Sequence, residues 1–282
     1  MRNMENYREN VLHLSDASLY YREYGEGSPL LMIHGVICDS AFFEYTAQYL
    51  AQKHRVITYD RRGYSRSSGK VGDDFWAEQA QDAISLLEKL CPNEQTIIVG
   101  CSAGAIIAMH VAARQPEMVA GLILHEPPLV QLLAPDHEAF AIAEKIKKLV
   151  SEGKYQRAIN QFLLLTGESD ERAPERREEA MQREANNMVY FIRWEFETTF
   201  SRGVLPDIPD NIPVAVCAGD AHRENYHYVV AHKYAVRCGY PVIHFPGVHN
   251  CARDLPLDFA VGVEGTISLP AMRKADIKRH EV

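Results

Sequence analysis

The chain has 282 residues, of which 46% are hydrophobic and 24% charged, and its formal net charge at pH 7 is −8. This length suits one large α/β domain with an insertion and a sizeable core. The acidic balance argues against nucleic acid or an anionic membrane as a partner, because both attract basic surfaces. The apolar runs are too short to span a bilayer, and the polar first ten residues lack a signal-peptide core, so we expect a cytoplasmic protein.

Strand-like and helix-like segments alternate over the first 127 residues. The strand-like runs stand at residues 11–14, 18–24, 30–33, 55–59, 95–99 and 119–124, and the helix-like runs at 41–52, 74–90 and 103–113. Asp74 is the expected N-cap of the second helix. The alternation predicts the α/β class, with a mostly parallel sheet and helices on both of its faces.

This rhythm breaks in the middle of the chain. No good strand pattern occurs between residues 128 and 209, where helical spacing is found at 139–150, 155–165 and 175–191. Strand-like runs return at 213–217 and 241–245, on either side of a helix-like run at 224–237. We therefore predict a helical cap over residues 128–209, inserted into one core made of residues 1–127 and 210–282.

The charged and aromatic residues of the cap have different expected places. The dense charge run from Asp170 to Arg183 is expected to be a solvated helix face, and the charged tail from Met272 to Val282 is expected to fray. Six large side chains could line a substrate pocket, although most of them are expected in the cap core: Phe162, Met188, Tyr190, Phe191, Trp194 and Phe196.

A G-x-S-x-G pentapeptide is the most informative motif. Gly100-Cys101-Ser102-Ala103-Gly104 joins the strand-like run 95–99 to the helix-like run 103–113. A serine on so sharp a strand-to-helix turn needs small neighbours two residues away on either side, because the backbones crowd there. The turn exposes the hydroxyl and directs a backbone N–H and the positive end of the helix to the same place. We therefore predict Ser102 as a catalytic nucleophile, with a glycine-rich turn carrying a surface serine as the alternative.

Two further segments follow strands at matching places. The run 30–33 ends in His34-Gly35-Val36, and the run 241–245 is followed by a loop that contains His249. A loop after a late strand is where the chain order serine, acid, histidine places the base. Because serine is a weak nucleophile, His249 is predicted to take its proton. The backbone N–H groups of Val36 and Ala103 are the predicted oxyanion donors, with Gly35 as the substitute for Val36.

Together these motifs resemble the α/β-hydrolase-fold superfamily over nearly the whole chain. Residues 60–67 are similar to that family's D-x-R-G-x-G-x-S stretch, with Tyr64 and Ser65 where the family often has an aromatic or small residue and then glycine. His34-Gly35 matches its oxyanion loop, and the pentapeptide matches its nucleophile elbow. The resemblance implies a serine hydrolase with a helical cap, which transfers an acyl group from an ester, lactone or related small molecule to water without a cofactor.

The position of the triad acid departs from the family's common pattern. Most relatives carry G-x-x-D after the strand that ends here at Cys217, but histidine stands at the expected acid position, and Asp220 could serve only if the loop shifts by two residues. The other candidate is Glu126, at the end of the strand after the nucleophile helix. Its H-E-x-P context is similar to that of fungal zearalenone-type lactonases, which place the acid there. We favour Glu126 over Asp220.

Other functions remain open on the same scaffold. A cofactor-free dioxygenase or lyase would use His249 as a base without an acyl-serine, and a ligand receptor would not catalyse at all. A dehalogenase or epoxide hydrolase would need aspartate at position 102, so Ser102 disfavours both. We expect a small-molecule substrate, no metal, and no nucleic-acid or membrane partner, and the sequence leaves a homo-oligomer open.

Arginine and cysteine residues near the motifs have structural interpretations. Arg61 and Arg62 could bind an anion, but an ion pair within the loop is favoured. The six cysteines include no C-x-x-C pair, so neither a zinc site nor a redox pair is indicated, and they are expected to be reduced core residues.

Overall fold

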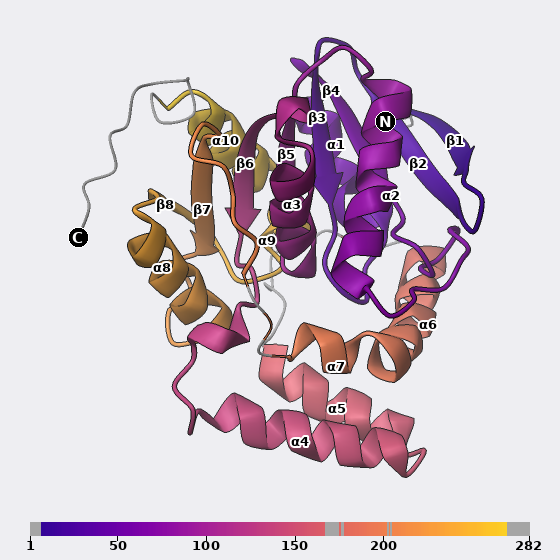
Figure 1. Cartoon of the computed structure of the whole chain (residues 1–282), viewed down its shortest axis with the longest axis vertical. Helices are drawn as coiled ribbons and strands as arrows, with labels where there is room; N and C mark the ends of the chain where they lie inside the picture. The colour runs from indigo at the N-terminus through magenta and orange to yellow at the C-terminus, as the bar shows by residue number, and fades with distance from the viewer. Residues whose placement is uncertain (1–6, 167–174, 176–177, 202, 204, 270–282) are drawn as a thin grey trace.

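One eight-stranded sheet organises the chain (Figure 1). The computed structural model describes residues 7–166, 175, 178–201, 203 and 205–269. The strand order is β1-β2-β4-β3-β5-β6-β7-β8. Strand β2 pairs antiparallel with both β1 and β4, and all other neighbouring strands of this sheet pair parallel. The strands are β1 (Tyr7–His13), β2 (Ser18–Tyr24), β3 (Ser28–Ile33), β4 (His54–Tyr59), β5 (Thr96–Cys101), β6 (Val119–His125), β7 (Val214–Gly219) and β8 (Val242–Phe245). The predicted α/β class is confirmed.

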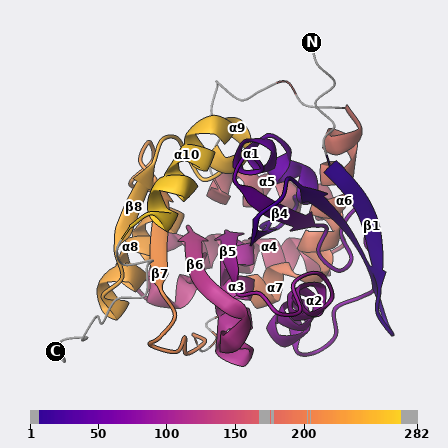
Figure 2. The ribbon, with the colours of Figure 1, turned by 90° about the horizontal axis from the view of Figure 1, so that it is seen from above.

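Helices cover both faces of this sheet (Figure 2). On one face, α1 (Glu44–Leu50) packs against α10 (Pro256–Ile267) in a cluster that includes Phe43 and Phe259. On the other, α2 (Phe75–Leu90), α3 (Ala103–Arg114) and α8 (Tyr226–Cys238) belong to a second cluster. The central strands are buried on both sides, which explains why their sequences read as continuous apolar runs.

The helical cap lies at the end of the sheet where the parallel strands finish (Figure 1). It consists of α4 (Glu138–Ser151), α5 (Tyr155–Thr166), α6 (Glu178–Trp194) and α7 (Phe196–Thr199), and no strand occurs in the described part of residues 128–209. Its core is aromatic: the Phe162 and Phe191 rings lie 4.7 Å apart, and the Phe196 and Phe200 rings 4.8 Å apart. Trp194, by contrast, is 61% exposed.

Hydrogen bonds from α6 attach the cap to two loops of the core. Arg183 Nε donates to Asp39 Oδ2 (2.6 Å), and Asn187 Nδ2 donates to Cys38 O (3.1 Å). Ser65 has a left-handed φ of 47°, and its N–H donates to Asn187 Oδ1 (3.0 Å). The left-handed conformation is one that glycine adopts without strain, so Asn187 stabilises a position where the family often has glycine.

These attachments correct one expectation about charge. Arg183 was predicted within a solvated helix face, but it is half-buried because it reaches the Asp39 carboxylate of the core. Residues 178–183 begin α6, whereas residues 170–174 and 176–177 lie outside the described residues. The tail predicted to fray, residues 272–282, also lies outside them.

The two adjacent arginines form ion pairs, but their partners lie outside the loop in which the sequence predicts them. Arg61 and Glu195 are both fully buried, with Arg61 Nη2 3.0 Å from Glu195 Oε2, and the Tyr64 hydroxyl donates to the same carboxylate. Arg62 binds Asp82 Oδ1 at 2.7 Å and also contacts Asp16. The Arg61 pair therefore joins the loop after β4 to the segment between α6 and α7.

Element boundaries differ from the predicted ones in small ways. Asp74 stands at the N-cap of α2, as expected, but its side chain makes no capping hydrogen bond. The helix expected at 41–52 is split into a short 3-10 turn, Ser40–Phe43, and α1. Helices α9 (Cys251–Asp254) and α10 were not predicted at all. In the part of the chain that the structure describes, no helix has the length and apolarity needed to cross a membrane.

Candidate active site

The predicted functional residues follow the carboxyl ends of neighbouring parallel strands. His34 follows β3, Ser102 follows β5, Glu126 follows β6, and His249 lies in the loop after β8. In an open α/β sheet this edge is where ligands bind. The cap lies over this edge, so the candidate site is between the sheet and the cap.

Ser102 stands on a sharp turn with an unusual backbone conformation. Its φ is 55° and its ψ −127°, and its N–H donates to His125 O at 2.8 Å. A Cβ at Gly100 would lie 2.5 Å from the Ala105 Cα, and a Cβ at Gly104 would lie 2.1 Å from the Ile33 carbonyl oxygen. Both positions therefore require glycine, as the pentapeptide predicted. Such strained non-glycine residues gather at functional sites.

The loop after β3 approaches Ser102 closely. A Cβ at Gly35 would lie 2.9 Å from Ser102 Cβ and 3.4 Å from its Oγ, so the backbone of this loop lies directly beside the serine. Among the described residues, the N–H groups of Val36 and Ala103 have no hydrogen-bond acceptor. Val36 lines the same cavity as Ser102, and Ala103 follows Ser102 as the first residue of α3. These N–H groups are available to a ligand oxygen.

Glu126 holds His249 through a short hydrogen bond. Glu126 Oε2 lies 2.6 Å from His249 Nδ1, and Glu126 Oε1 accepts from the Gly219 N–H at 2.9 Å. The backbone of Glu126 is left-handed, with φ 45°, and its N–H donates to Cys217 O of β7. Backbone groups of β7 therefore fix this carboxylate while it contacts the imidazole ring.

The environment of Glu126 keeps its carboxylate ionised. Burial alone raises the pKa of Glu126, but hydrogen bonding to His249, the charges of His125 and His249 and the Gly219 N–H together hold it below its ordinary value of 4.5. The neighbouring His125 is fully buried, and burial lowers its pKa to about 4, with Glu126 opposing and His249 adding to that shift. His125 is therefore neutral at pH 7.

Asp220, the alternative acid, lies elsewhere. It is exposed, its Oδ1 accepts from the Gly247 N–H at 3.3 Å, and its own N–H donates to Phe245 O. The carboxylate on the His249 ring nitrogen is that of Glu126. The catalytic assignment of either acid stays a prediction.

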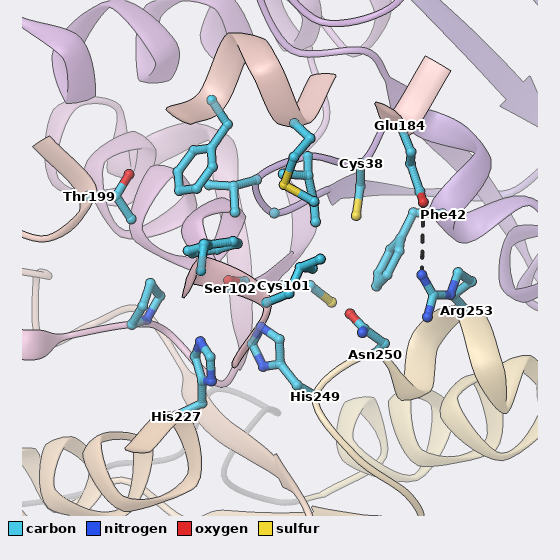
Figure 3. Close-up of a pocket in the computed structure, with 18 of the residues that line it drawn as sticks. Cys38, Phe42, Cys101, Ser102, Glu184, Thr199, His227, His249, Asn250 and Arg253 are labelled. Carbon is cyan, nitrogen blue, oxygen red and sulfur yellow. Dashed lines mark ion pairs between the residues drawn. The ribbon is translucent and has the colours of Figure 1, made fainter. Parts of the chain in front are cut away.

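A cavity of about 250 Å³ lies at this edge of the sheet, beneath the cap (Figure 3). Ser102 and His249 line its floor, and Phe162, Met188 and Phe191 of the cap contribute apolar walls. The other three cap residues considered from the sequence, Tyr190, Trp194 and Phe196, are not among its lining residues. At the cap boundary, Glu184 of α6 and Arg253 of α9 form an ion pair at 3.8 Å. No hydrogen bond joins Ser102 Oγ to His249 among the contacts of the described residues.

Sequence reasoning missed His227, which also lines the cavity. Its ring stacks on the His249 ring, with centroids 3.8 Å apart and planes at 21°. No recognised catalytic motif contains it, and it is one of twelve histidines. Its place two residues after Asn225, the N-cap of α8, is the signal that could have put it at the sheet edge.

The cysteines of the described residues are free thiols. All six lie among the described residues, five of them are buried, and none forms a disulfide. Burial raises the pKa of the Cys101 thiol well above its ordinary value, so the residue beside Ser102 is not a thiolate. Within the described residues, no group of three or more His, Cys, Asp or Glu side chains could hold a metal ion.

Comparison with known proteins assigns this architecture to a family. A family model described as the alpha/beta hydrolase fold matches residues 28–191, more than half of the chain. The chain belongs to the alpha/beta hydrolase fold family. This membership agrees with the sheet order, the turn at Ser102 and the cap insertion described above.

The individual proteins to which this chain is similar share about a fifth to a third of their aligned residues with it. An uncharacterized hydrolase of Bacillus subtilis is 29% identical over 248 residues, covering 85% of this chain and 89% of its own. A pimeloyl-[acyl-carrier protein] methyl ester esterase of Aliivibrio fischeri is 34% identical over 106 residues, covering 38% and 39%. The solved structure of a candidate epoxide hydrolase of Pseudomonas aeruginosa superposes with a TM-score of 0.72 at 18% identity, covering 95% of this chain and 97% of that one, which shows the fold alone. The functional class that these findings support is hydrolase.

Proposed function

We propose that this alpha/beta hydrolase cleaves an ester, lactone or related carbonyl bond of a small molecule through an acyl-serine intermediate. Ser102 is the nucleophile, His249 the general base and acid, and Glu126 the carboxylate that orients the imidazole. The observation that carries the proposal is the Glu126–His249 hydrogen bond of 2.6 Å. It lies at the same edge of the sheet as Ser102, which stands on the sharp strand-to-helix turn typical of a nucleophile.

The first half of the reaction forms the acyl-enzyme. His249 Nε2 takes the Ser102 proton while Ser102 Oγ bonds to the substrate carbonyl carbon. The tetrahedral intermediate then collapses, the carbon–oxygen bond to the leaving alcohol breaks, and the alcohol oxygen receives the proton from His249. In the second half, His249 takes a proton from a water molecule while the water oxygen bonds to the acyl carbon. The bond between that carbon and Ser102 Oγ then breaks, the acid is released, and Ser102 Oγ receives the proton from His249.

The environment of His249 suits this proton traffic. Its Nδ1 faces the ionised carboxylate of Glu126, which fixes the proton on Nδ1 and leaves Nε2 as the acceptor. When His249 becomes positively charged, Glu126 supplies the countercharge at hydrogen-bond distance. The proposal requires His249 Nε2 to reach Ser102 Oγ in the substrate complex, where catalytic hydrogen bonds often tighten.

The backbone N–H groups of Val36 and Ala103 stabilise the oxyanion in this proposal. Both lack an acceptor among the described residues, and Ala103 sits at the positive end of the α3 dipole. Backbone donors are already fixed before the substrate binds, so they cost no reorganisation during the reaction. The cavity of about 250 Å³ limits the substrate to a small molecule or to the reacting end of a larger one.

A labelling experiment followed by a substrate panel tests this function. A serine-directed fluorophosphonate should add one group to the intact protein, on the peptide that contains Ser102, and the Ser102→Ala variant should stay unlabelled. The labelled protein should lose all activity against a panel of short-chain esters and lactones. Labelling at another residue, or no labelling at all, would contradict an acyl-serine mechanism.

The same panel separates the two alternative functions. Turnover that requires oxygen and survives the Ser102→Ala substitution would indicate a cofactor-free dioxygenase. Turnover that survives this substitution without oxygen would indicate a lyase. Ligand binding without turnover, accompanied by a change of shape in solution, would indicate a receptor.

A further inference from the structure

His227 stands between the wall of the cavity and the predicted catalytic base. It is 2% exposed, lines the cavity, and stacks on His249 with ring centroids 3.8 Å apart. In Figure 3 one nitrogen of the His227 ring is directed toward the side of the cavity where Ser102 lies.

The N-cap of α8 fixes the tautomer of His227. Asn225 Oδ1 accepts from the His227 backbone N–H at 3.0 Å, so the amide oxygen of Asn225 must face this histidine. The same oxygen lies 2.9 Å from His227 Nδ1. Because an amide oxygen only accepts, Nδ1 carries the proton, and Nε2 bears a lone pair.

His227 is also neutral. Burial is the largest cause that lowers the pKa of His227 well below its ordinary value of 6.5, and electrostatic interactions with the His249 and His125 rings lower it further. Among the contacts of the described residues, none places a hydrogen-bond donor on Nε2. The cavity that Ser102 lines is therefore also lined by a neutral histidine with a free acceptor nitrogen, opposite apolar side chains of the cap.

We propose that His227 Nε2 is a substrate-recognition group, which accepts a hydrogen bond from a hydroxyl or N–H of the bound molecule. The reaction of the recognised substrate rests on the proposed function. The hydrogen bond from the bound molecule to His227 Nε2 does not depend on it. It narrows the substrate class to carbonyl compounds that carry a donor group close to the scissile bond, such as hydroxylated esters or hydroxylated lactones. A buried acceptor left unpaired by a substrate without a donor disfavours that substrate.

Two substitutions separate recognition from mere packing. His227→Phe keeps a flat ring against His249 and removes the acceptor. His227→Gln places an amide oxygen near the position of Nε2 and removes the ring stacking. A role in packing alone predicts that Phe is tolerated and Gln is harmful, whereas recognition predicts the reverse for substrates with a donor group.

The probes are p-nitrophenyl esters in two matched pairs, in which p-nitrophenyl butyrate is compared with its 2-hydroxy and with its 3-hydroxy derivative. In the wild-type protein, kcat/KM should favour the hydroxylated member of at least one pair by about tenfold, the size of one hydrogen bond. His227→Phe should remove that preference, so that kcat/KM becomes equal within each pair to about twofold. His227→Gln should retain part of the preference.

Binding is measured in parallel, so that the recognition role of His227 is tested even if no ester is hydrolysed. The hydrolytically inactive Ser102→Ala variant is titrated with the same ester pairs, alone and with His227→Phe. If no ester is turned over by the wild-type protein, the acyl-serine proposal fails while these affinities still test His227. Equal affinities in every pair, no detectable binding, or a preference that survives His227→Phe would each overturn the recognition role.

Discussion

Glu126 Oε2 and His249 Nδ1 lie 2.6 Å apart, although 123 residues separate them in the sequence. Glu126 follows β6 and His249 follows β8, so the contact spans β7, whose Gly219 N–H also binds Glu126. The carboxylate is thus held by backbone and side chain from two strand ends at once. This relationship makes Glu126 the stronger candidate for the triad acid, and it leads to the first prediction.

Glu126→Gln should lower kcat by about three orders of magnitude while leaving the fold intact, because the imidazolium of His249 loses its countercharge. Asp220→Asn is the matched control, since Asp220 is exposed and bonds only backbone near the same loop. It should keep more than about half of the activity. Steady-state kinetics of both variants decide the assignment, and the opposite ranking would assign the acid to Asp220.

The buried ion pair between Arg61 and Glu195 should matter for stability. Glu195→Gln leaves the Arg61 guanidinium charged and uncompensated in the interior, which should lower the free energy of unfolding by about 3 kcal/mol. Glu94→Gln removes a surface partner of Arg55 and should cost less than about 1 kcal/mol. Denaturant unfolding of both variants measures the two costs, and equal costs would argue against a structural role for the buried pair.

Buried His125 should make the protein sensitive to mild acid. Its folded-state pKa of about 4 lies below its ordinary value of 6.5, so between these values the unfolded chain binds a proton that the folded chain does not. Stability should therefore fall as the pH drops from 6.5 to 4, by about 3 kcal/mol from this residue alone, and level off below 4.

His125→Phe should flatten this dependence. Phenylalanine cannot titrate, and it keeps the ring contacts with Phe245 and Phe259. Glu126 contributes in a separate window, because its lowered pKa stabilises the folded state above pH 4.5 and that contribution is lost as the pH falls further. Unfolding free energies measured from pH 7 to 4 test the prediction, and an unchanged slope in the variant would refute it.

The cap should control which acyl chains fit. Met188→Ala removes a wall of the cavity and should raise kcat/KM for longer acyl chains relative to short ones by roughly tenfold. Trp194→Ala, on the same helix but 61% exposed, should leave that ratio unchanged. A series of p-nitrophenyl esters from acetate to octanoate gives the two profiles. Identical profiles for the two variants would mean that Met188 does not limit the acyl site.

Much of this arrangement was predictable because local signals and topology agreed. The glycines around Ser102 are imposed by backbone approaches of 2.1 and 2.5 Å, so the motif in the sequence directly reports the geometry. Parallel strands bring their carboxyl ends to one edge, which places the residue after β6 near the loop after β8. That rule brought both Glu126 and Asp220 within reach of His249 but could not choose between them.

The features that sequence reasoning missed depend on side-chain direction across long separations. Arg183 resembles any surface arginine of a charged helix, and only the folded chain brings it to Asp39. His227 lies at the first turn of α8, and its stacking on His249 follows from the packing of α8 against β7 rather than from local spacing. Helix α10 lacks a strong polar face, so its periodicity is weak in the sequence.

Kinetics of the Ser102→Ala variant test the central claim most directly. The substitution removes only the hydroxyl from a residue that is 9% exposed, so the melting temperature should change by no more than a few degrees. With the best ester or lactone of the panel, kcat should fall by about four orders of magnitude or more, as expected for the loss of a covalent nucleophile. Hydrolysis of that substrate at near wild-type rate by the folded variant would contradict the account.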